Sequence, residues 1–153
     1  MAIRRDDFPL PDLSDERVAP FFAGAARHEL TIPRCDGCGR LVWYPEPACP
    51  TCGGTSFTWT AVRGSGRLYS WAVVRRAFLP AFADRVPFVT GLVALEDDPA
   101  VRIVTYIVDC DPLGLRADDP VRVRFEDLSF PTVPGRSVTV PVFTPERASE
   151  SPA

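Results

Sequence analysis

Four of the five cysteines in this chain fall in two close pairs, and these pairs constrain its fold more than any other feature. Cys35 pairs with Cys38 and Cys49 with Cys52, each pair having a two-residue spacer and a glycine directly after it. The short spacer lets both thiolates of a pair reach one ion from a tight turn, and the glycine permits a left-handed backbone that directs amides at the sulfurs. Four thiolates at about 2.3 Å complete a tetrahedral shell with no open position, which is typical of a structural zinc site.

The metal module, residues 31–57, is short, so we expect its folding to depend on the bound ion. The stretch between the two pairs is long enough only for a short hairpin arm that returns to the ion. So small a module buries too little apolar surface to fold alone, and metal binding would supply much of its folding free energy. A redox iron site and a pair of disulfides are the alternatives for the same ligands. The N-terminus has no apolar signal segment, so we expect a cytoplasmic protein, which favours zinc over disulfides.

The remaining cysteine and the single histidine offer little for catalysis. Cys110 lies between two aspartates at the end of an expected strand, where a half-buried free thiol is the ordinary outcome. A catalytic thiolate would need a histidine beside it, and His28 is interpreted as a solvated residue at a helix end. The chain has no lysine, no nucleophile elbow and no phosphate-binding glycine loop. We therefore expect no activity from the chain alone.

Charge and apolar content limit the partners that the chain can have. The net charge is −3, and all 17 basic residues are arginine, so an anionic ligand must be held by guanidinium groups or backbone amides. An acidic chain is a poor candidate for a general nucleic-acid binder, which usually carries a basic surface. No run approaches the roughly 20 apolar residues that span a bilayer, so no membrane association is expected.

The sequence predicts one helix before the cysteines and a series of strands after them. The helical spacing of Phe21, Phe22, Ala25 and Ala26 indicates a helix over about 15–28, capped by Ser14 or beginning at Pro20. The two adjacent phenylalanines point in different directions. Either both belong to the hydrophobic core, or one faces the body of the protein and the other faces a partner protein. Strands are expected over 57–62, 68–74, 88–95, 101–108, 121–125 and 137–143. Such strands with a glycine-bent start suit a small Greek-key barrel such as the OB-fold, although other small barrels share this pattern.

A long loop over 75–87 is the one candidate ligand site outside the metal module. It carries Arg75, Arg76, Phe78 and Arg85 between two expected strands. Loops of this length are often functional. Guanidinium groups beside apolar side chains suit a ligand with phosphates at one end and an apolar body, such as an acyl-CoA thioester. A loop with solvated arginines, or a contact with another protein, is the alternative.

Seven short motifs follow one another in a specific order between about residues 14 and 145. They are APFF at 19–22, LTIPRCDGCG at 30–39, PEPACPTCG at 45–53, GSGRLYSW at 64–71, PF at 87–88, VDCDP at 108–112 and VPVF at 140–143. This order resembles the zinc-ribbon/OB-fold proteins long known as a domain of unknown function and associated with acyl-CoA metabolism. The cysteine motif is shared with many ribbons, but its order with the later motifs is much more specific.

The resemblance implies a mainly β fold with an N-terminal helix, a rubredoxin-like zinc ribbon and a C-terminal OB-fold barrel. The predicted divisions are 1–30 for an extended segment and the helix, 31–57 for the ribbon, 58–145 for the OB-fold and 146–153 for a flexible tail. With all four cysteines kept, zinc is the expected metal.

The resemblance also implies a role as a non-catalytic subunit in a hetero-oligomer with a thiolase-like acyl-CoA enzyme. Such enzymes include thiolases, acyltransferases and the retro-aldolases of steroid side-chain degradation, where a similar domain is fused to a hydratase. The partner would supply the catalytic groups, and this chain would stabilise it and help to form the acyl-CoA path. The alternative is a single-stranded nucleic-acid binder whose stacking residues would be Tyr69, Trp71 and Phe88. The acidity of the chain counts against that alternative.

Overall fold

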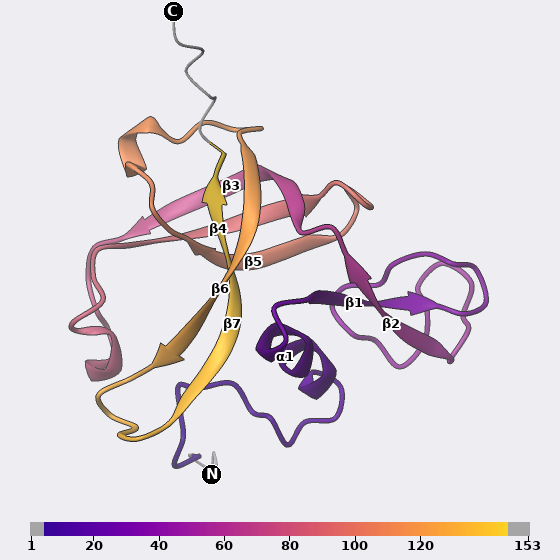
Figure 1. Ribbon diagram of the computed structural model, residues 1–153, viewed down its shortest axis with the longest axis horizontal. Coiled ribbons are helices and arrows are strands. Elements are labelled where there is room, and N and C mark those ends of the chain that lie inside the picture. The colour runs from indigo at the N-terminus through magenta and orange to yellow at the C-terminus, as the bar shows by residue number, and fades with distance from the viewer. Residues whose placement is uncertain (1–4, 147–153) are drawn as a thin grey trace, which may run out of the picture.

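The computed structural model describes residues 5–146, in which a two-stranded arm and a five-stranded barrel flank a single α-helix. Figure 1 shows the helix between the barrel and the arm, with the cysteine loops at the far end of the arm. The elements are α1 (Ala19–Ala26), β1 (Leu30–Cys35), β2 (Phe57–Val62), β3 (Ser65–Val74), the 3₁₀ turn η1 (Pro80–Phe82), β4 (Phe88–Leu95), β5 (Arg102–Ile107), the 3₁₀ turn η2 (Pro112–Gly114), β6 (Pro120–Ser129) and β7 (Ser137–Pro145). Apart from Glu146, the predicted flexible tail lies outside the described residues.

The helix is shorter than the sequence predicts. It has Val18 at its N-cap and a proline in its first turn, so the hydrogen-bonded turn at 15–18 does not continue into it. Ser14 does not cap it and instead donates its hydroxyl to the side chain of Asp12. The helix ends where His28 takes a φ of 59°, and the N–H of Glu29 donates to the carbonyl oxygen of Gly24 in a Schellman arrangement. The prediction of 15–28 was therefore wrong at both ends, while the start at Pro20 is close to what is observed.

Strands β1 and β2 form an antiparallel sheet of their own, outside the barrel. Leu30 pairs with Val62 at one end of this sheet and Cys35 with Phe57 at the other. The sequence did not predict β1, which contains a proline at position 33. The predicted boundary between residues 57 and 58 falls at the start of β2. The segment between the cysteine pairs makes only a single bridge, between Leu41 and Arg34, rather than a full hairpin.

The other five strands close into a barrel in the order β3-β4-β5-β7-β6. All neighbouring pairs are antiparallel except β5 and β7, which meet at Ile107 and Phe143 as a parallel pair. A closed five-stranded Greek-key barrel is the architecture of the OB-fold, so the predicted fold class is confirmed. The glycines before and inside the first barrel strand mark its bend, because Gly64 has a φ of 74° and Gly66 lies directly against the backbone of Ala94.

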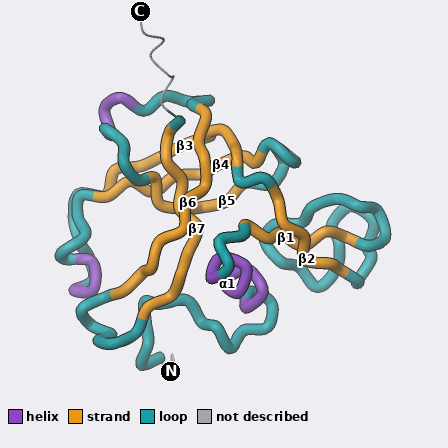
Figure 2. Tube along the Cα trace, in the orientation of Figure 1, coloured by secondary structure: helices purple, strands orange, loops and turns teal. Residues whose placement is uncertain are grey.

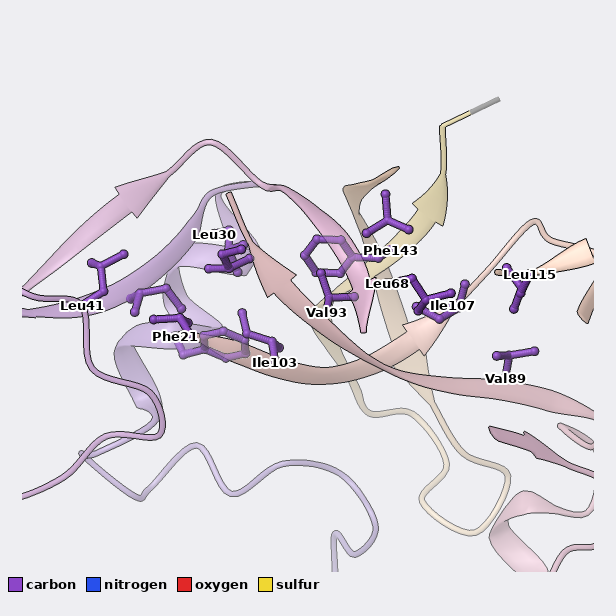
Figure 3. Packing of buried hydrophobic residues seen from close by; sticks show 14 residues of the cluster. Phe21, Leu30, Leu41, Leu68, Val89, Val93, Ile103, Ile107, Leu115 and Phe143 are labelled. Atoms are coloured by element: carbon purple, nitrogen blue, oxygen red, sulfur yellow. The ribbon is translucent and has the colours of Figure 1, made fainter. Parts of the chain in front are cut away.

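One hydrophobic cluster extends from the barrel into the arm, as Figure 3 shows. Phe21 of α1, Leu30 of β1 and Leu41 of the cysteine module belong to the same cluster as Val93 and Phe143 of the barrel. Helix, arm and barrel are therefore packed as one body. Within residues 5–146, no helix has the length and apolar character needed to cross a membrane.

A second, smaller core holds the β3–β4 loop against the β6–β7 loop and the N-terminal segment. It consists of Leu10, Ala81, Phe130 and Val133. In Figure 2 this loop, with its short η1 turn, lies at the end of the molecule opposite the cysteine module. The two features that the sequence singled out are thus at opposite ends of the protein.

Candidate functional site

The four paired cysteines come together at the tip of the arm. Their sulfur atoms all lie within 4.8 Å of one another. The Sγ atoms of Cys35 and Cys52 are 3.5 Å apart and those of Cys38 and Cys49 are 3.7 Å apart. A regular tetrahedron of sulfurs at about 2.3 Å from zinc has edges of about 3.8 Å. The donor set and its spacing therefore fit a structural zinc ion, as the sequence predicts.

Each cysteine pair is shaped by the glycine that follows it. Gly39 and Gly53 have φ values of 75° and 77°, a conformation that favours glycine. Each donates its N–H to the carbonyl oxygen of the first cysteine of its pair, at 2.8 Å. The N–H of Gly54 then donates to Sγ of Cys52 at 3.4 Å. The first two hydrogen bonds close the tight turns that carry the sulfurs, and the third offsets part of the negative charge on the sulfur of Cys52.

The charges of the four cysteine sulfurs favour the binding of a cation between them. Backbone N–H groups of Cys52 and Thr51 lower the pKa of Cys49 to about 6. The N–H of Gly54 acts to lower the pKa of Cys52, but the sulfur of Cys35, desolvation and the other two sulfurs together raise this pKa to about 11. Four adjacent sulfurs thus cannot all ionise unaided. A bound Zn²⁺ would supply the missing positive charge and hold the module folded, with no open position for catalysis.

An aspartate in the first spacer fastens the metal module to β2, which the sequence analysis missed. Asp36 accepts hydrogen bonds from the hydroxyls of Ser56 at 2.5 Å and Thr58 at 2.7 Å. These two hydrogen bonds lower the pKa of Asp36. The only available signal was an acidic residue in the spacer and two hydroxyl residues at the start of the next strand, one just before it and one within it. Val42 and Phe57 complete the support by packing against the buried cysteines.

The other two candidate reactive groups are not arranged for catalysis. Desolvation and the charges of Asp111 and Asp109 raise the pKa of Cys110, so its thiol is less ionised than an ordinary cysteine. His28 stacks on Phe125, with ring centroids 5.3 Å apart and planes within 3°. A catalytic thiolate needs a lowered pKa and a neighbouring base. Neither is present at Cys110 within the described residues.

The four predicted ligand residues of the β3–β4 loop have different surroundings. Arg85 turns toward the β6–β7 loop, where it donates to the carbonyl oxygen of Ser129 at 2.5 Å and lies 4.6 Å from the ring centroid of Phe130. Arg75 and Arg76 are exposed, and Phe78 is 86% exposed. The structure therefore anchors one member of the set and leaves the other three in solvent.

Two cavities lie beside the barrel, and the sequence analysis identified neither of them. The first, of about 500 Å³, is an apolar groove between α1 and strands β4, β5 and β7. Its lining includes Phe22, Val74, Phe82, Phe88, Val104 and Tyr106. The second, of about 520 Å³, shares Phe88 and Tyr106 with the groove. It also contains Arg85 and three carboxylates, those of Asp109, Glu126 and Asp127. That excess of carboxylates opposes the binding of phosphate groups there.

Comparison with known proteins agrees with this architecture. Residues 22–58 match the family model described as "ChsH2, rubredoxin-like zinc ribbon domain", and residues 59–126 match "ChsH2, C-terminal OB-fold domain". A "DUF35 domain-containing scaffold protein" of Methanothermobacter thermautotrophicus is 31% identical over 65% of this chain and 73% of its own length. The chain belongs to the DUF35 family.

Other similar proteins differ in length and in their degree of similarity to this chain. A "probable enoyl-CoA hydratase alpha subunit" of Thermomonospora curvata is 33% identical over 90% of this chain, which spans about 40% of that relative's length. A solved chain described as "Ltp2-ChsH2(DUF35) aldolase" is 30% identical, with a TM-score of 0.74 over 88% of this chain and 98% of that one. A DUF35 protein of unknown function from Sulfolobus solfataricus is 11% identical with a TM-score of 0.54, which shows a shared fold alone.

Proposed function

We propose that this DUF35 protein is a non-catalytic accessory subunit of a thiolase-like acyl-CoA enzyme. The observation that carries the proposal is the likeness to the chain from the Ltp2-ChsH2(DUF35) aldolase, which this chain matches over 98% of that chain's length. Two relatives with names that denote a subunit and a scaffold support the same role. The chain would stabilise its partner and contribute to the acyl-CoA path, while the partner would supply the catalytic residues.

The chemistry of the described residues supports a non-catalytic role. The four clustered cysteines would fill a closed metal shell, and Cys110 has a raised pKa. His28, the single histidine of the sequence, is engaged in a stack with Phe125. These groups leave little for acid–base or nucleophilic work near neutral pH.

The apolar groove supports an association with another protein. Phe22 lines it from α1, and Val104 of β5 lies in it with 59% of its surface exposed. Exposed apolar surfaces of this kind often mark sites of protein contact. Phe21 lines the groove as well, and both phenylalanines pack in or against the main core, so the floor of the groove is continuous with that core. The groove is therefore a candidate for part of the partner interface.

The residues expected to stack on nucleic-acid bases do not form an open platform. Trp71 packs against the main core, and Phe88 packs edge-on against Tyr106. Tyr69 is half exposed, but Arg102 lies 4.0 Å from the centroid of its ring. The nearby cavity carries three carboxylates, which repel a phosphate backbone. These observations favour the accessory-subunit proposal over nucleic-acid binding.

Co-expression with thiolase-like proteins, with candidates taken first from the genes that neighbour this one, tests the proposal. A tag on one chain should recover both, and light scattering should give the mass of a hetero-oligomer. The partner expressed alone should be less soluble or less active. Failure to form a complex, together with a fully active partner in the absence of this chain, would show that the proposal is wrong.

A further inference from the structure

The tip of the β3–β4 loop exposes the side chains of two consecutive apolar residues. Phe78 is 86% exposed and Leu79 is 43% exposed, just after Arg75 and Arg76. Single exposed apolar residues are common on proteins. What distinguishes this tip is the combination of its apolar side chains with a fixed backbone and unpaired charges.

The segment that follows the tip is held firmly against the barrel. Ala81 is buried in the small core with Leu10 and Phe130, and the ring of Phe82 packs on Phe130 at 5.2 Å. Arg85 completes the attachment through the carbonyl oxygen of Ser129. The tip is thereby presented on an ordered support, which lowers the entropy cost of binding through it.

The two arginines at the tip lack the partners that most other arginines have. Within the described part of the chain, no ion pair and no side-chain hydrogen bond is found for Arg75 or Arg76. By contrast, Arg122 pairs with Glu146 at 2.8 Å, and Arg124 pairs with Asp109. The tip thus places two uncompensated positive charges beside an apolar centre, on a chain whose net charge is −3.

The shape of the tip favours a protein over a small molecule. Ligand sites are concave and enclose most of their ligand. Arg75, Arg76 and Phe78 line neither of the two cavities beside the barrel. At the base of the loop, however, Val74 and Phe82 line the apolar groove. The tip therefore projects beside the groove that is the candidate partner surface.

We propose that the segment 75–79 is a docking knob, that is, a protruding segment through which this chain binds the thiolase-like partner. Phe78 inserts into an apolar pocket of that partner. Arg75 and Arg76 face carboxylates at the rim of the pocket. This inference rests on the proposed function and names the surface through which it acts. It interprets the loop as a contact with another protein, which was the alternative hypothesis for this loop. Acyl-CoA binding by these three residues is the hypothesis that it replaces. An aromatic anchor with flanking arginines is a common composition for the centre of a protein interface.

Binding kinetics of the purified partner with variants of the full chain test the knob. Phe78→Ala should raise the Kd by about tenfold or more, chiefly through faster dissociation. The double variant Arg75→Gln/Arg76→Gln should slow association by several-fold and weaken its dependence on salt. Leu113→Ala and Arg116→Gln are matched controls at and after the η2 turn, outside the segment 75–79, where Leu113 is 89% exposed. Both controls should bind as the unaltered chain does.

The outcomes separate this inference from the proposed function. If the unaltered chain binds the partner and Phe78→Ala binds equally well, the knob is refuted while the proposed function stands. If the tip variants instead lose affinity for octanoyl-CoA and keep their affinity for the partner, the loop is a ligand site and the inference is wrong. Absence of any complex with the unaltered chain refutes the proposed function itself. A loss of affinity confined to the tip variants supports the knob.

Discussion

The ring of Phe21 packs against the ring of Trp43, with centroids 4.8 Å apart and an angle of 37° between the planes. Phe21 belongs to α1, and Trp43 belongs to the segment between the two cysteine pairs. Phe21 is also part of the core cluster that contains Ile103 and Phe143 of the barrel. A single side chain therefore joins the helix, the metal module and the barrel.

Truncation of this side chain should destabilise the whole protein. Phe21→Ala should lower the free energy of unfolding by about 3–5 kcal/mol, as expected for a buried phenylalanine that leaves a cavity. Urea unfolding of the zinc-loaded protein measures the loss. Phe78→Ala is the matched control, and at 86% exposure it should change the free energy by less than about 0.5 kcal/mol. Equal effects of the two substitutions would contradict the assigned packing.

Removal of one sulfur should release the metal and loosen only the arm. Cys38→Ser should lose zinc, because three thiolates no longer complete the shell. Amide exchange should become faster in β1 and β2, while the barrel strands β4 to β7 keep most of their protection. Cys110→Ser is the control and should retain one zinc per chain by elemental analysis. Stoichiometric zinc in Cys38→Ser would mean that the ligands are misassigned.

A methyl group at Gly66 should disrupt the first bend of the barrel. A Cβ there would lie 2.5 Å from the carbonyl oxygen of Ala94, a backbone atom that cannot move aside. Gly66→Ala should therefore cost about 2–3 kcal/mol, in the range of overpacking substitutions. Gly135→Ala serves for comparison: its Cβ meets nothing within 4 Å, but its φ of 74° should still cost about 1–2 kcal/mol. Thermal unfolding ranks the two variants, and a Gly66 variant more stable than the Gly135 variant would argue against this register.

The thiol of Cys110 should react slowly, and its rate should rise with pH. Desolvation and the neighbouring charges of Asp111 and Asp109 raise its pKa, so less thiolate is present at pH 8 than in an ordinary cysteine. Asp111→Asn removes one negative charge, lowers that pKa and should speed alkylation by iodoacetamide about twofold to fivefold. Mass spectrometry of the zinc-loaded protein locates the label, and Cys110→Ser gives the background. An unchanged rate in Asp111→Asn would exclude the electrostatic cause.

Elements whose residues show a clear local pattern of apolar side chains or cysteines could be predicted from the sequence. The alternation over 57–62 and the apolar run over 88–95 predicted the bounds of β2 and β4 to the residue, and the spacing of the cysteines predicted the metal site. β1 was missed because Pro33 interrupts its pattern and because its pairing partner β2 follows only after the metal module. The helix boundaries were wrong because Asp15 and Val18 form a separate turn ahead of Pro20, which local propensity does not distinguish from a helical start.

Features that depend on distant contacts were not predictable in the same way. The parallel meeting of Ile107 with Phe143 follows from closure of the barrel, and no local pattern indicates it. The different positions of Arg85 and Arg75 likewise depend on Ser129, which lies 44 residues from Arg85 in the chain. The sequence could propose the loop as a site, but it could not tell which side chains anchor the loop and which face solvent.

Acyl-CoA turnover by the separate and combined chains tests the central claim most directly. The purified DUF35 protein should show no turnover of an acyl-CoA thioester, the thiolase-like partner alone should show little, and the reconstituted pair should be fully active. Activity that depends on the pair, and that is kept in Cys110→Ser, is the predicted result. Turnover by the isolated DUF35 protein, or full activity of the partner without it, would contradict the account.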